Sequence, residues 1–486
     1  MNINKPNDKN VILVKSILKE LEKYDNYCDE NNNPHIIINN TNYLLDDKNF
    51  KDEIFDICIK NDIDAGMTIV NKVISILKSR IRGNGLKKSL DYRVSKSEND
   101  ILYQLSNKEM VVISKKGYKV EKVDNTYFKM NNTFKEQNIP VLKKGDIDNL
   151  INLLNLSDDD KFLVIIHLHL LFIPKISIPA LVLTSEKATG KTTITKIIKR
   201  LVDPTPNGIG RMPKGMPELE KMFASSHLLC FDNIDYLSNE QSNAICRAIT
   251  GDTYEKTNFE NSYISQYARP IIINGINCPI FKSDLISRCI IIEPNKIKDV
   301  NRLTDNEITE IIEQNIDLNL GYIFENISKI LNIVDNLVIP NSNYRMGDYN
   351  KYAYAIANII EPKGGDRFLK IMNYKQERQN KTIVNNNSVA TNIIDYFTNY
   401  GVILRRNEPQ EYTSTEFYNI IRNVAYDNGN INNFPKASNK FITELNKIKD
   451  VLRDEEILIT TNISKCNANY VRVERVLKGE WLWLIL

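Results

Sequence analysis

Apolar residues recur at helical spacing in the first part of the chain and then give way to short strand-like runs. Residues 10–24, 49–61 and 63–82 follow the helical pattern, with a small hairpin predicted at 35–47. From about residue 100 to 130, short apolar runs alternate with Asn-Lys and Lys-Gly turns, which is typical of strands. We therefore predict an N-terminal α+β module over residues 1–140.

Between residues 141 and 300 the pattern becomes one of apolar strands separated by helices. The predicted strands include 178–184, 227–231 and 269–274. The helix after the first of them carries one apolar face, made of Ile194, Ile197, Ile198 and Leu201. Repeats of strand, loop and helix predict a mostly parallel sheet covered by helices, so the chain belongs to the multidomain α/β class.

The last third of the chain is predicted to contain two further parts. Residues 301–380 are mainly helical, and the polar stretch "QNKTIVNNN" at 379–387 reads as a linker. Residues 388–486 then contain a helix opened by Thr413, with Glu416 three positions later, which is a capping-box pattern. A second helix and two strands follow. Helix, helix and hairpin is the order of a winged-helix domain.

The stretch "LVLTSEKATGKTTITK", Leu181 to Lys196, contains a candidate phosphate-binding loop. Gly190, Lys191 and Thr192 fit the pattern G-x-x-x-x-G-K-[ST], but Ser185 replaces the first glycine. The loop follows a buried strand and opens an amphipathic helix, as a phosphate site requires. The residues expected to bind ATP here are Ser185, Glu186, Lys187, Ala188, Thr189, Gly190, Lys191, Thr192 and Thr193.

The distance that each group can span toward a bound nucleotide suggests its role in this loop. Backbone N–H groups from Glu186 to Thr192 would surround the β-phosphate, Lys191 would span the β- and γ-phosphates, and the Thr192 hydroxyl would bind Mg²⁺. Because serine adopts positive φ less readily than glycine, we expect a slightly strained or altered turn at Ser185.

A carboxylate for the same Mg²⁺ is expected at Asp232, at the end of the apolar run "HLLCF"; a helix-capping role for Asp232 is the alternative. ATPases of this type usually have a glutamate next, to orient the attacking water, but this chain has Asn233. An amide can orient water but cannot accept its proton, so Asp235 is the second candidate for the base.

Two further polar residues complete the expected catalytic set. Asn274 ends the strand "RPIIIN" and is placed to contact the γ-phosphate or its water. Arg288 lies between a short helix and another apolar strand. An arginine there is expected to reach a neighbouring subunit's nucleotide and stabilise charge on the γ-phosphoryl group, with a surface salt bridge as the alternative. The first interpretation requires a ring.

Together these motifs resemble the AAA+ core. The segments "CFDNIDYLSNEQSNAICRAITGDTYEK", "SDLISRCIIIEP" and "YRMGDYNKYAYAIANII" resemble, in order and spacing, the replicative AAA+ ATPases of phages and integrated mobile elements. That group is similar to MCM-like helicases and replication initiators, and more distantly to poxvirus-type primase-helicases. The resemblance implies a helical lid at 301–380, ATP and Mg²⁺ as cofactors, and Arg345 as a second sensor.

The resemblance also implies DNA as the substrate. Related helicases carry a basic hairpin that points into the ring's pore; residues 251–269 can form one, with Lys256 near the tip, although an ordinary surface insertion is the alternative. A basic group upstream could bind a phosphate backbone, with an ordinary solvated surface as the alternative; it consists of Lys78, Arg80, Arg82, Lys87, Lys88, Arg93 and Lys96. The predicted winged helix offers basic residues to duplex DNA, with contact to a protein as the alternative; these residues are Lys436, Lys440, Lys447 and Arg472.

Composition adds few constraints. The net charge is +3, from 64 basic and 61 acidic residues, so any basic surface must be local. The seven cysteines lack zinc-ligand spacing and are expected to be buried thiols. No apolar run is long enough to span a membrane, and the N-terminus lacks the apolar core of a signal peptide, so a cytoplasmic protein without membrane contact is expected.

Two main functions remain open at this point. The first is an ATP-driven DNA helicase and replication initiator, a ring expected to be a hexamer, that engages single-stranded DNA and, through the winged helix, origin duplex DNA; a primase partner is compatible with it. The alternative is an AAA+ remodeller or helicase loader that acts on a protein. A binding module with an inactive ATPase would gain weight only if Asn233 abolished hydrolysis.

Overall fold

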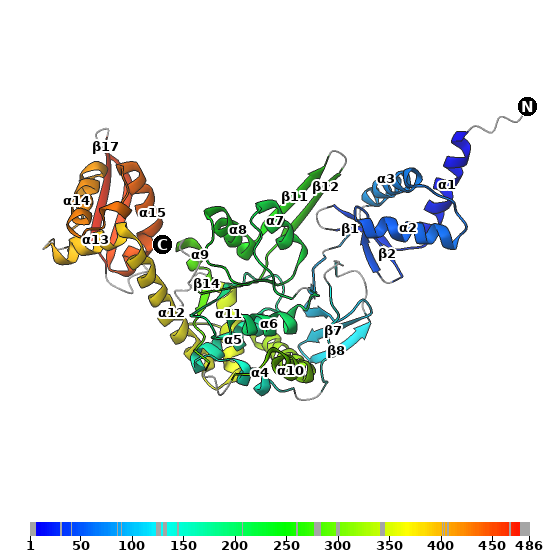
Figure 1. Ribbon diagram of the computed structural model, residues 1–486, viewed down its shortest axis with the longest axis horizontal. Helices are drawn as coiled ribbons and strands as arrows, with labels where there is room; N and C mark the ends of the chain where they lie inside the picture. Colours follow the sequence, from blue (N-terminus) through cyan, green and yellow to red (C-terminus); the bar gives the residue numbers. More distant parts are fainter. Residues whose placement is uncertain are drawn as a thin grey trace, which may run out of the picture. The chain divides into compact units, whose positions relative to one another are not determined.

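The computed structural model of the 486-residue chain divides into two compact units. The first contains residues 1–279 and 288–369, and the second contains 280–287 and 370–486. The structure describes residues 6–29, 32–39, 41–84, 86–88, 90–122, 128–129, 134–142, 145–206, 208–258, 261–276, 283–297, 302–340, 346–400, 402, 404–405, 408–465 and 468–476. Figure 1 traces the elements in chain order.

The N-terminal part of the first unit is a small α/β assembly. Its elements are α1 (Pro6–Leu21), β1 (Asn26–Asp29), β2 (Pro34–Ile38), β3 (Thr41–Leu44), α2 (Lys48–Lys60), α3 (Met67–Gly83) and β4 (Lys87–Lys88). The strands form a sheet in the order β3-β2-β1-β4, and α1, α2 and α3 contribute to a common apolar core. The predicted helices and the predicted hairpin at 35–47 are confirmed, with His35 paired to Leu44.

An antiparallel four-stranded sheet follows. It contains β5 (Val94–Ser97), β6 (Asp100–Gln104), β7 (Glu109–Ser114) and β8 (Gly117–Lys122), in that order. Its Tyr103 ring packs 5.2 Å from the ring of Phe172 and 5.4 Å from the ring of Phe324, both in the central part of the unit. These contacts join the second half of the predicted N-terminal module to the residues that follow it. The boundary after residue 140 stays a prediction.

The central part is built on a parallel sheet. Its elements are α4 (Asp148–Leu153), α5 (Asp158–Leu170), β9 (Ala180–Thr184), α6 (Lys191–Val202), α7 (Met216–Ser225), β10 (Leu229–Phe231), α8 (Asn239–Thr250), β11 (Asp252–Asn258), β12 (Asn261–Tyr267), β13 (Ile271–Gly275) and β14 (Cys289–Ile292). The sheet order is β10-β13-β9-β14, with every pair parallel. The predicted parallel sheet with helices is confirmed.

The strand order places β13 between β9 and β10, although β13 follows both in the sequence. A further parallel bridge joins Gly210 to Phe231, on the other side of β10. β9 and β13 are mostly apolar, and all of their residues are buried. The carboxyl ends of β9, β10 and β13 therefore lie at the same edge of the sheet, where α/β proteins bind ligands.

Helices α10 (Asp305–Ile333), α11 (Gly347–Ile360) and α12 (Gly364–Asn386) follow the sheet, with a short 3₁₀ turn, η2 (Val334–Asn336), after α10. Thr304 and Glu307 form a capping box at the start of α10. The predicted linker at 379–387 is wrong, because α12 continues through it to Asn386. The many asparagines of this stretch suggested a loop, but helical geometry is maintained through them.

The second unit combines the end of α12 and the short helix α9 (Ser283–Ile286) with the C-terminal elements. These are α13 (Ser388–Asn399), β15 (Gln410–Thr413), α14 (Ser414–Asp427), η3 (Ile431–Asn433), α15 (Ser438–Asp454), β16 (Ile457–Lys465) and β17 (Ala468–Arg475). The capping box predicted from Thr413 and Glu416 is confirmed. The three strands form an antiparallel sheet in the order β15-β17-β16, so the predicted hairpin is also confirmed.

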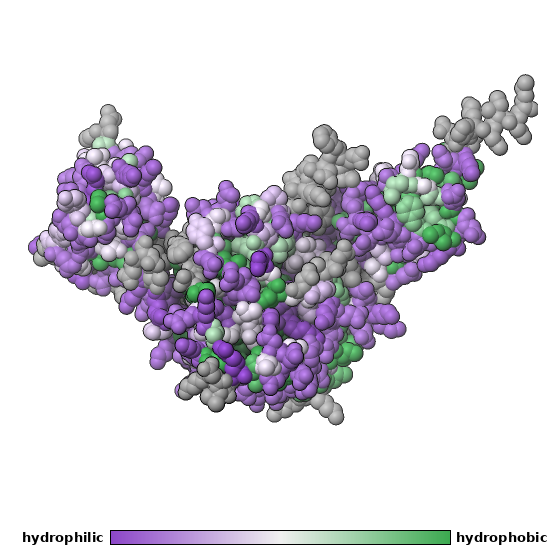
Figure 2. Space-filling model, in the orientation of Figure 1, coloured by the Kyte–Doolittle hydropathy of each residue, from purple (hydrophilic) through white to green (hydrophobic). Residues whose placement is uncertain are grey.

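Hydrophilic residues dominate the face of the molecule drawn in Figure 2, with apolar residues scattered among them. Within the described part of the chain, no helix has both the length and the apolar character that a membrane crossing requires. Five of the seven cysteines are described, and all five are buried: Cys28, Cys58, Cys230, Cys246 and Cys289.

Candidate active site

The loop between β9 and α6 is held by two residues in the left-handed region of backbone space. These are Ala188, with φ of 64°, and Gly190, with φ of 84°. Ser185, which replaces the expected first glycine, is not among the residues with positive φ. The expectation of strain at Ser185 is therefore wrong, because the loop turns at positions 188 and 190 instead.

Ser185 forms a brace across the base of this loop. Its Oγ lies 2.6 Å from Oγ1 of Thr189, and Thr189 Oγ1 also donates to the Glu186 carbonyl over 3.2 Å. The Thr189 side chain is buried, whereas Glu186, Lys187 and Ala188 are exposed. A glycine at position 185 could not form this hydrogen bond, so the serine contributes order that the usual residue does not.

The Lys191 ammonium group lies inside the loop. Its Nζ donates to the carbonyl oxygens of Ser185 and Glu186 over 2.7 and 2.6 Å. Burial lowers the pKa of Lys191, and the nearby Asp232 partly opposes that shift. Gly190 has no side chain with which to cap α6, so the positive end of the helix dipole and its first N–H groups face the loop. This arrangement suits an anionic group such as a phosphate.

Thr192 and Asp232 come from different elements and meet at the edge of the sheet. Thr192 is the second residue of α6, and Asp232 follows directly after β10. The Thr192 Oγ1 donates to the Asp232 Oδ1 over 3.1 Å. Magnesium is held in proteins by one or two carboxylates together with substrate phosphates and water. The Thr192 hydroxyl and the Asp232 carboxylate are oxygen donors of this kind, so the pair fits a magnesium site that a bound phosphate would complete.

Asn274 is buried between α6 and the loop that follows β10. Its Oδ1 accepts the Asn233 backbone N–H over 2.9 Å, and its Nδ2 donates to Thr195 Oγ1 over 3.1 Å. The Asn274 carbonyl also accepts the N–H of Ile234 over 2.9 Å. Both ends of this amide are therefore hydrogen-bonded within the protein, and the predicted contact of Asn274 with the γ-phosphate or its water stays a prediction.

Thr195 was missed by the sequence analysis. It is fully buried on the apolar face of α6, and its hydroxyl donates to the Lys191 carbonyl over 3.0 Å. A polar residue between Ile194 and Ile197 on this face was the available signal. Asn233 and Asp235 are exposed, and Thr193 is half-buried. Asn233 has φ of 56°, which carries the chain sharply away from the end of β10.

Arg288 lies at the amino ends of the strands, whereas the nucleotide loop lies at their carboxyl ends. Its carbonyl accepts the Ala180 N–H over 2.9 Å, and the next residue, Cys289, pairs with Ala180 at the start of β9. The loop begins beyond Thr184, about 13 Å farther along the strand at the usual rise per residue. The structure therefore brings together Lys191, Thr192, Asp232, Asn233 and Asn274, and it separates Arg288 from them.

Two predicted residues cannot be assigned geometry. Arg345 lies outside the described residues, and for Lys256 only the backbone is described. The predicted hairpin is confirmed: β11 and β12 pair antiparallel, and Lys256 is opposite Tyr263. The last described pair is Asn258 with Asn261, so Lys256 lies two pairs before the hairpin's end.

The basic group predicted upstream of the sheet is only partly available to a ligand. Arg93 is buried and forms an ion pair with Asp203, and Lys78 is buried against Asp46. The Arg80 guanidinium lies 2.9 Å from Glu22. Arg93 and Lys78 therefore do not belong to a basic patch that could bind a phosphate backbone, because both are buried and ion-paired.

The basic residues of the second unit are more accessible. Lys436 and Lys440 are exposed. Lys447 is also exposed and lies 2.7 Å from Glu444 on the same helix. Arg472 donates two hydrogen bonds to Glu411, so a phosphate would have to compete with this carboxylate for its guanidinium group. A cleft of about 550 Å³ lies beside Lys440 and Lys447.

The central part of the chain is similar to a known family. Residues 147–360, just under half of the chain, match the family described as "Actinomycete integrative conjugative element replication protein". No curated protein matches the sequence.

Solved structures similar to this chain include the apo A form of the NrS-1 C-terminal region, at 13% identity and a TM-score of 0.43; the match covers 96% of this chain and 98% of that one. Another is titled SCCmec type IV Cch, active helicase, at 14% identity and a TM-score of 0.40, covering 93% of each chain. The sequence match over residues 147–360 makes the central part of this chain similar to replication proteins of mobile elements.

Proposed function

We propose that the chain is an ATP hydrolase of the AAA+ type that acts as a DNA helicase and replication initiator of a mobile element or phage. The observation that carries this proposal is the meeting of Thr192, at the start of α6, with Asp232, at the end of β10. In the sheet, β13 lies between β9 and β10, and Asn274 is its penultimate residue. A phosphate-binding lysine, two magnesium ligands and a polar residue thus converge at one sheet edge.

Each residue has a defined role in this proposal. The α6 N-terminus and the loop N–H groups bind the β-phosphate, and Lys191 moves from the loop carbonyls to the β- and γ-phosphates. Thr192 and Asp232 hold Mg²⁺, which neutralises charge on the phosphate oxygens. Asn274 fixes the loop that carries Asn233 and Asp235. Asp235 is the proposed base, because the Asn233 amide cannot accept a proton.

The position of Arg288 supports a shared active site. It lies at the sheet edge opposite the nucleotide loop, so it cannot stabilise the γ-phosphate of its own subunit by a small side-chain movement. In a ring, such an arginine can reach the neighbour's nucleotide. ATPase activity should therefore be lost in Arg288→Ala and in Lys191→Ala alone, and partly restored when the two proteins are mixed. No restoration in a confirmed mixed ring would contradict action between subunits.

Three observations support DNA as the substrate. The central part is similar to replication proteins of integrative conjugative elements. The β11–β12 hairpin is inserted between β10 and β13, at the position where related helicases carry a pore hairpin. The second unit has the element order of a winged helix, with exposed Lys436 and Lys440. Single-stranded DNA in the ring's pore and duplex DNA on the winged helix are the proposed partners.

An unwinding assay with 3′- and 5′-tailed duplexes tests the proposal. The protein should hydrolyse ATP faster with single-stranded DNA and unwind one of the two substrates. Lys191→Ala should lose both activities, whereas Lys196→Ala should keep them, because that residue of the same helix is exposed and pairs with Asp305 at the surface. ATPase activity without any response to DNA would contradict the helicase function and favour action on a protein.

A further inference from the structure

The carboxyl end of α6, far from the nucleotide loop, is capped by the residue that follows it and by two side chains from distant parts of the chain. The last four carbonyls of any helix lack partners within it. For α6 the first of these, Lys199, accepts the Asp203 N–H. The next two, Arg200 and Leu201, accept from Nε2 of Gln137 over 3.1 and 2.9 Å. The last, Val202, accepts from the Tyr103 hydroxyl over 3.0 Å.

Tyr103 and Gln137 lie outside the parallel sheet that carries the nucleotide site. Tyr103 belongs to β6 of the antiparallel sheet, and Gln137 to the segment that follows that sheet. Both are buried, and Gln137 Nε2 also lies 3.3 Å from the Tyr103 hydroxyl. A buried carbonyl that lost such a donor would keep its full desolvation cost, so these bonds constrain the helix end strongly.

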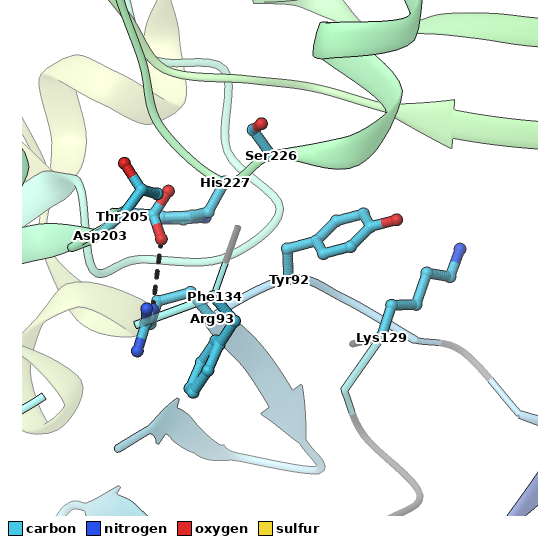
Figure 3. Close-up of a pocket in the computed structure, with 8 residues that line it drawn as sticks. All are labelled: Tyr92, Arg93, Lys129, Phe134, Asp203, Thr205, Ser226 and His227. Carbon is cyan, nitrogen blue, oxygen red and sulfur yellow. Dashed lines mark hydrogen bonds and ion pairs between the residues drawn. The ribbon is translucent and has the colours of Figure 1, made fainter. Parts of the chain in front are cut away.

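Arg93 directly precedes β5 of the same antiparallel sheet, and it adds a charged contact just beyond the carboxyl end of α6. Its guanidinium donates to Asp203 over 3.2 Å and to the Pro204 carbonyl over 3.1 Å. Figure 3 shows it beside Asp203, with the Phe134 ring against it. Arg93 is fully buried and has φ of 60°, an unfavourable conformation that the surrounding contacts must maintain.

Asp203 also contacts the residue before β10, the strand that leads to the proposed magnesium ligand Asp232. The Asp203 carboxylate accepts the Leu228 N–H over 3.2 Å, and Lys199, bound to the same carboxylate, donates to the Leu228 carbonyl over 2.7 Å. Leu228 directly precedes β10, and Asp232 directly follows it. Helix α6 and strand β10 are therefore linked at both ends, by Asp203 with Lys199 at one end and by Thr192 with Asp232 at the other.

We propose that Tyr103, Gln137 and Arg93 are positioning residues for the nucleotide site. They fix the far end of α6, which at 12 residues is about 18 Å long, and through Asp203 they fix the start of β10. Because a helix moves as a rigid element, release of its carboxyl end displaces Lys191 and Thr192 relative to Asp232. This inference rests on the proposed ATPase function. In it, the antiparallel sheet holds α6 in the position that the nucleotide site needs.

Two tyrosines of the antiparallel sheet provide a matched pair for the test. Tyr103 and Tyr118 both pack against Phe324, and each donates its hydroxyl to a backbone carbonyl. The carbonyl bound by Tyr103 is Val202 of α6, whereas the one bound by Tyr118 is Val141. Replacement of either tyrosine by phenylalanine removes one hydroxyl and keeps the ring packing.

The measurements are kcat and KM for ATP, the thermal midpoint, and hydrogen exchange of peptides covering residues 186–195 in the nucleotide-free protein. Tyr103→Phe should lower kcat about tenfold, since small misplacements of reacting groups have large effects on rate. It should also raise exchange in that peptide. Tyr118→Phe should also lower the thermal midpoint, because it removes a hydroxyl bound to a carbonyl, but it should change neither kcat nor that exchange.

Equal losses of kcat in both variants would overturn the inference, because a general loss of stability would then explain them; so would an unchanged kcat in Tyr103→Phe. If the wild-type protein hydrolyses no ATP, the proposed function fails and exchange alone decides. Faster exchange at 186–195 in Tyr103→Phe only would still support positioning of α6, and equal exchange in the two variants would overturn it.

Discussion

The backbone N–H of Asn233 donates to the side-chain oxygen of Asn274 over 2.9 Å, while Asn233 itself has a left-handed backbone, with φ of 56°. Asparagine and glycine adopt this conformation at lower cost than other residues. The replacement of the usual glutamate by Asn233 therefore has a conformational reason. This residue turns the chain at the end of β10 so that two consecutive N–H groups, those of Asn233 and Ile234, bind Asn274.

Substitutions at Asn233 should follow backbone preference. Asn233→Ala should lower the free energy of unfolding by about 1 kcal/mol, because alanine pays the steric cost of the left-handed region. Asn233→Gly should change it by less than about 0.5 kcal/mol, since glycine has no such cost. Denaturant unfolding of the two variants measures the difference, and equal effects would show that the backbone conformation of this position does not matter.

Restoring the consensus glycine at position 185 should not improve the nucleotide site. Ser185→Gly removes the hydrogen bond to Thr189 and adds backbone freedom, so the free energy of unfolding should fall by about 1–2 kcal/mol. The Kd for ATP should stay the same or rise. Ser185→Ala, which removes only the hydroxyl, is the control and should lose less stability. Tighter ATP binding in Ser185→Gly would mean that the loop does need the glycine.

The Thr192–Asp232 pair makes magnesium dependence a direct test of the metal site. Asp232→Asn keeps the size of the side chain but removes its charge, so kcat should fall by about 10²-fold or more. The Mg²⁺ concentration needed for half-maximal ATP binding should rise. Asp305→Asn, at an exposed position on α10, should behave like the wild type. An unchanged magnesium midpoint in Asp232→Asn would exclude this carboxylate as a ligand.

Buried histidines should make the protein less stable in mild acid. Burial lowers the pKa of His167 to about 3, and it lowers the pKa of His169 to about 4. An unfolded histidine titrates near 6.5. Below that pH the unfolded chain binds protons that the folded chain does not, so the free energy of unfolding falls by up to about 1.4 kcal/mol per pH unit for each group, until the folded pKa is reached.

His167→Leu should reduce this pH dependence by about one proton between pH 6 and 5. Among the described residues, neither ring nitrogen of His167 has a hydrogen-bond partner, so leucine leaves no polar group unpaired. His169→Leu would instead remove the contact of that ring with Asn326, and it should lower stability at pH 8 as well. An unchanged slope in His167→Leu would show that this residue is not neutral in the folded protein.

Several features of the site could be predicted because they depend on neighbouring residues in the sequence. The apolar run before Asp232 and the amphipathic pattern after Thr192 define a strand that ends and a helix that begins at these positions, and the structure has both. The role of Ser185 could not be predicted, because the position of the left-handed turn depends on the whole loop. The asparagine-rich segment 379–387 has the composition of a linker, but helix α12 continues through it to Asn386.

The sequence by itself determined which residues could do the chemistry: Lys191, Thr192 and Asp232 follow from short patterns of apolar spacing, glycine and charge. Only the tertiary structure decided that β13 lies between β9 and β10, that Arg288 is at the far edge of the sheet, and that Tyr103 and Gln137 cap α6. The physical reason is the separation along the sequence of the residues that interact. Local patterns follow from hydrogen bonding and burial within one element, whereas strand order and capping by residues 60 to 100 positions away depend on how the whole chain packs.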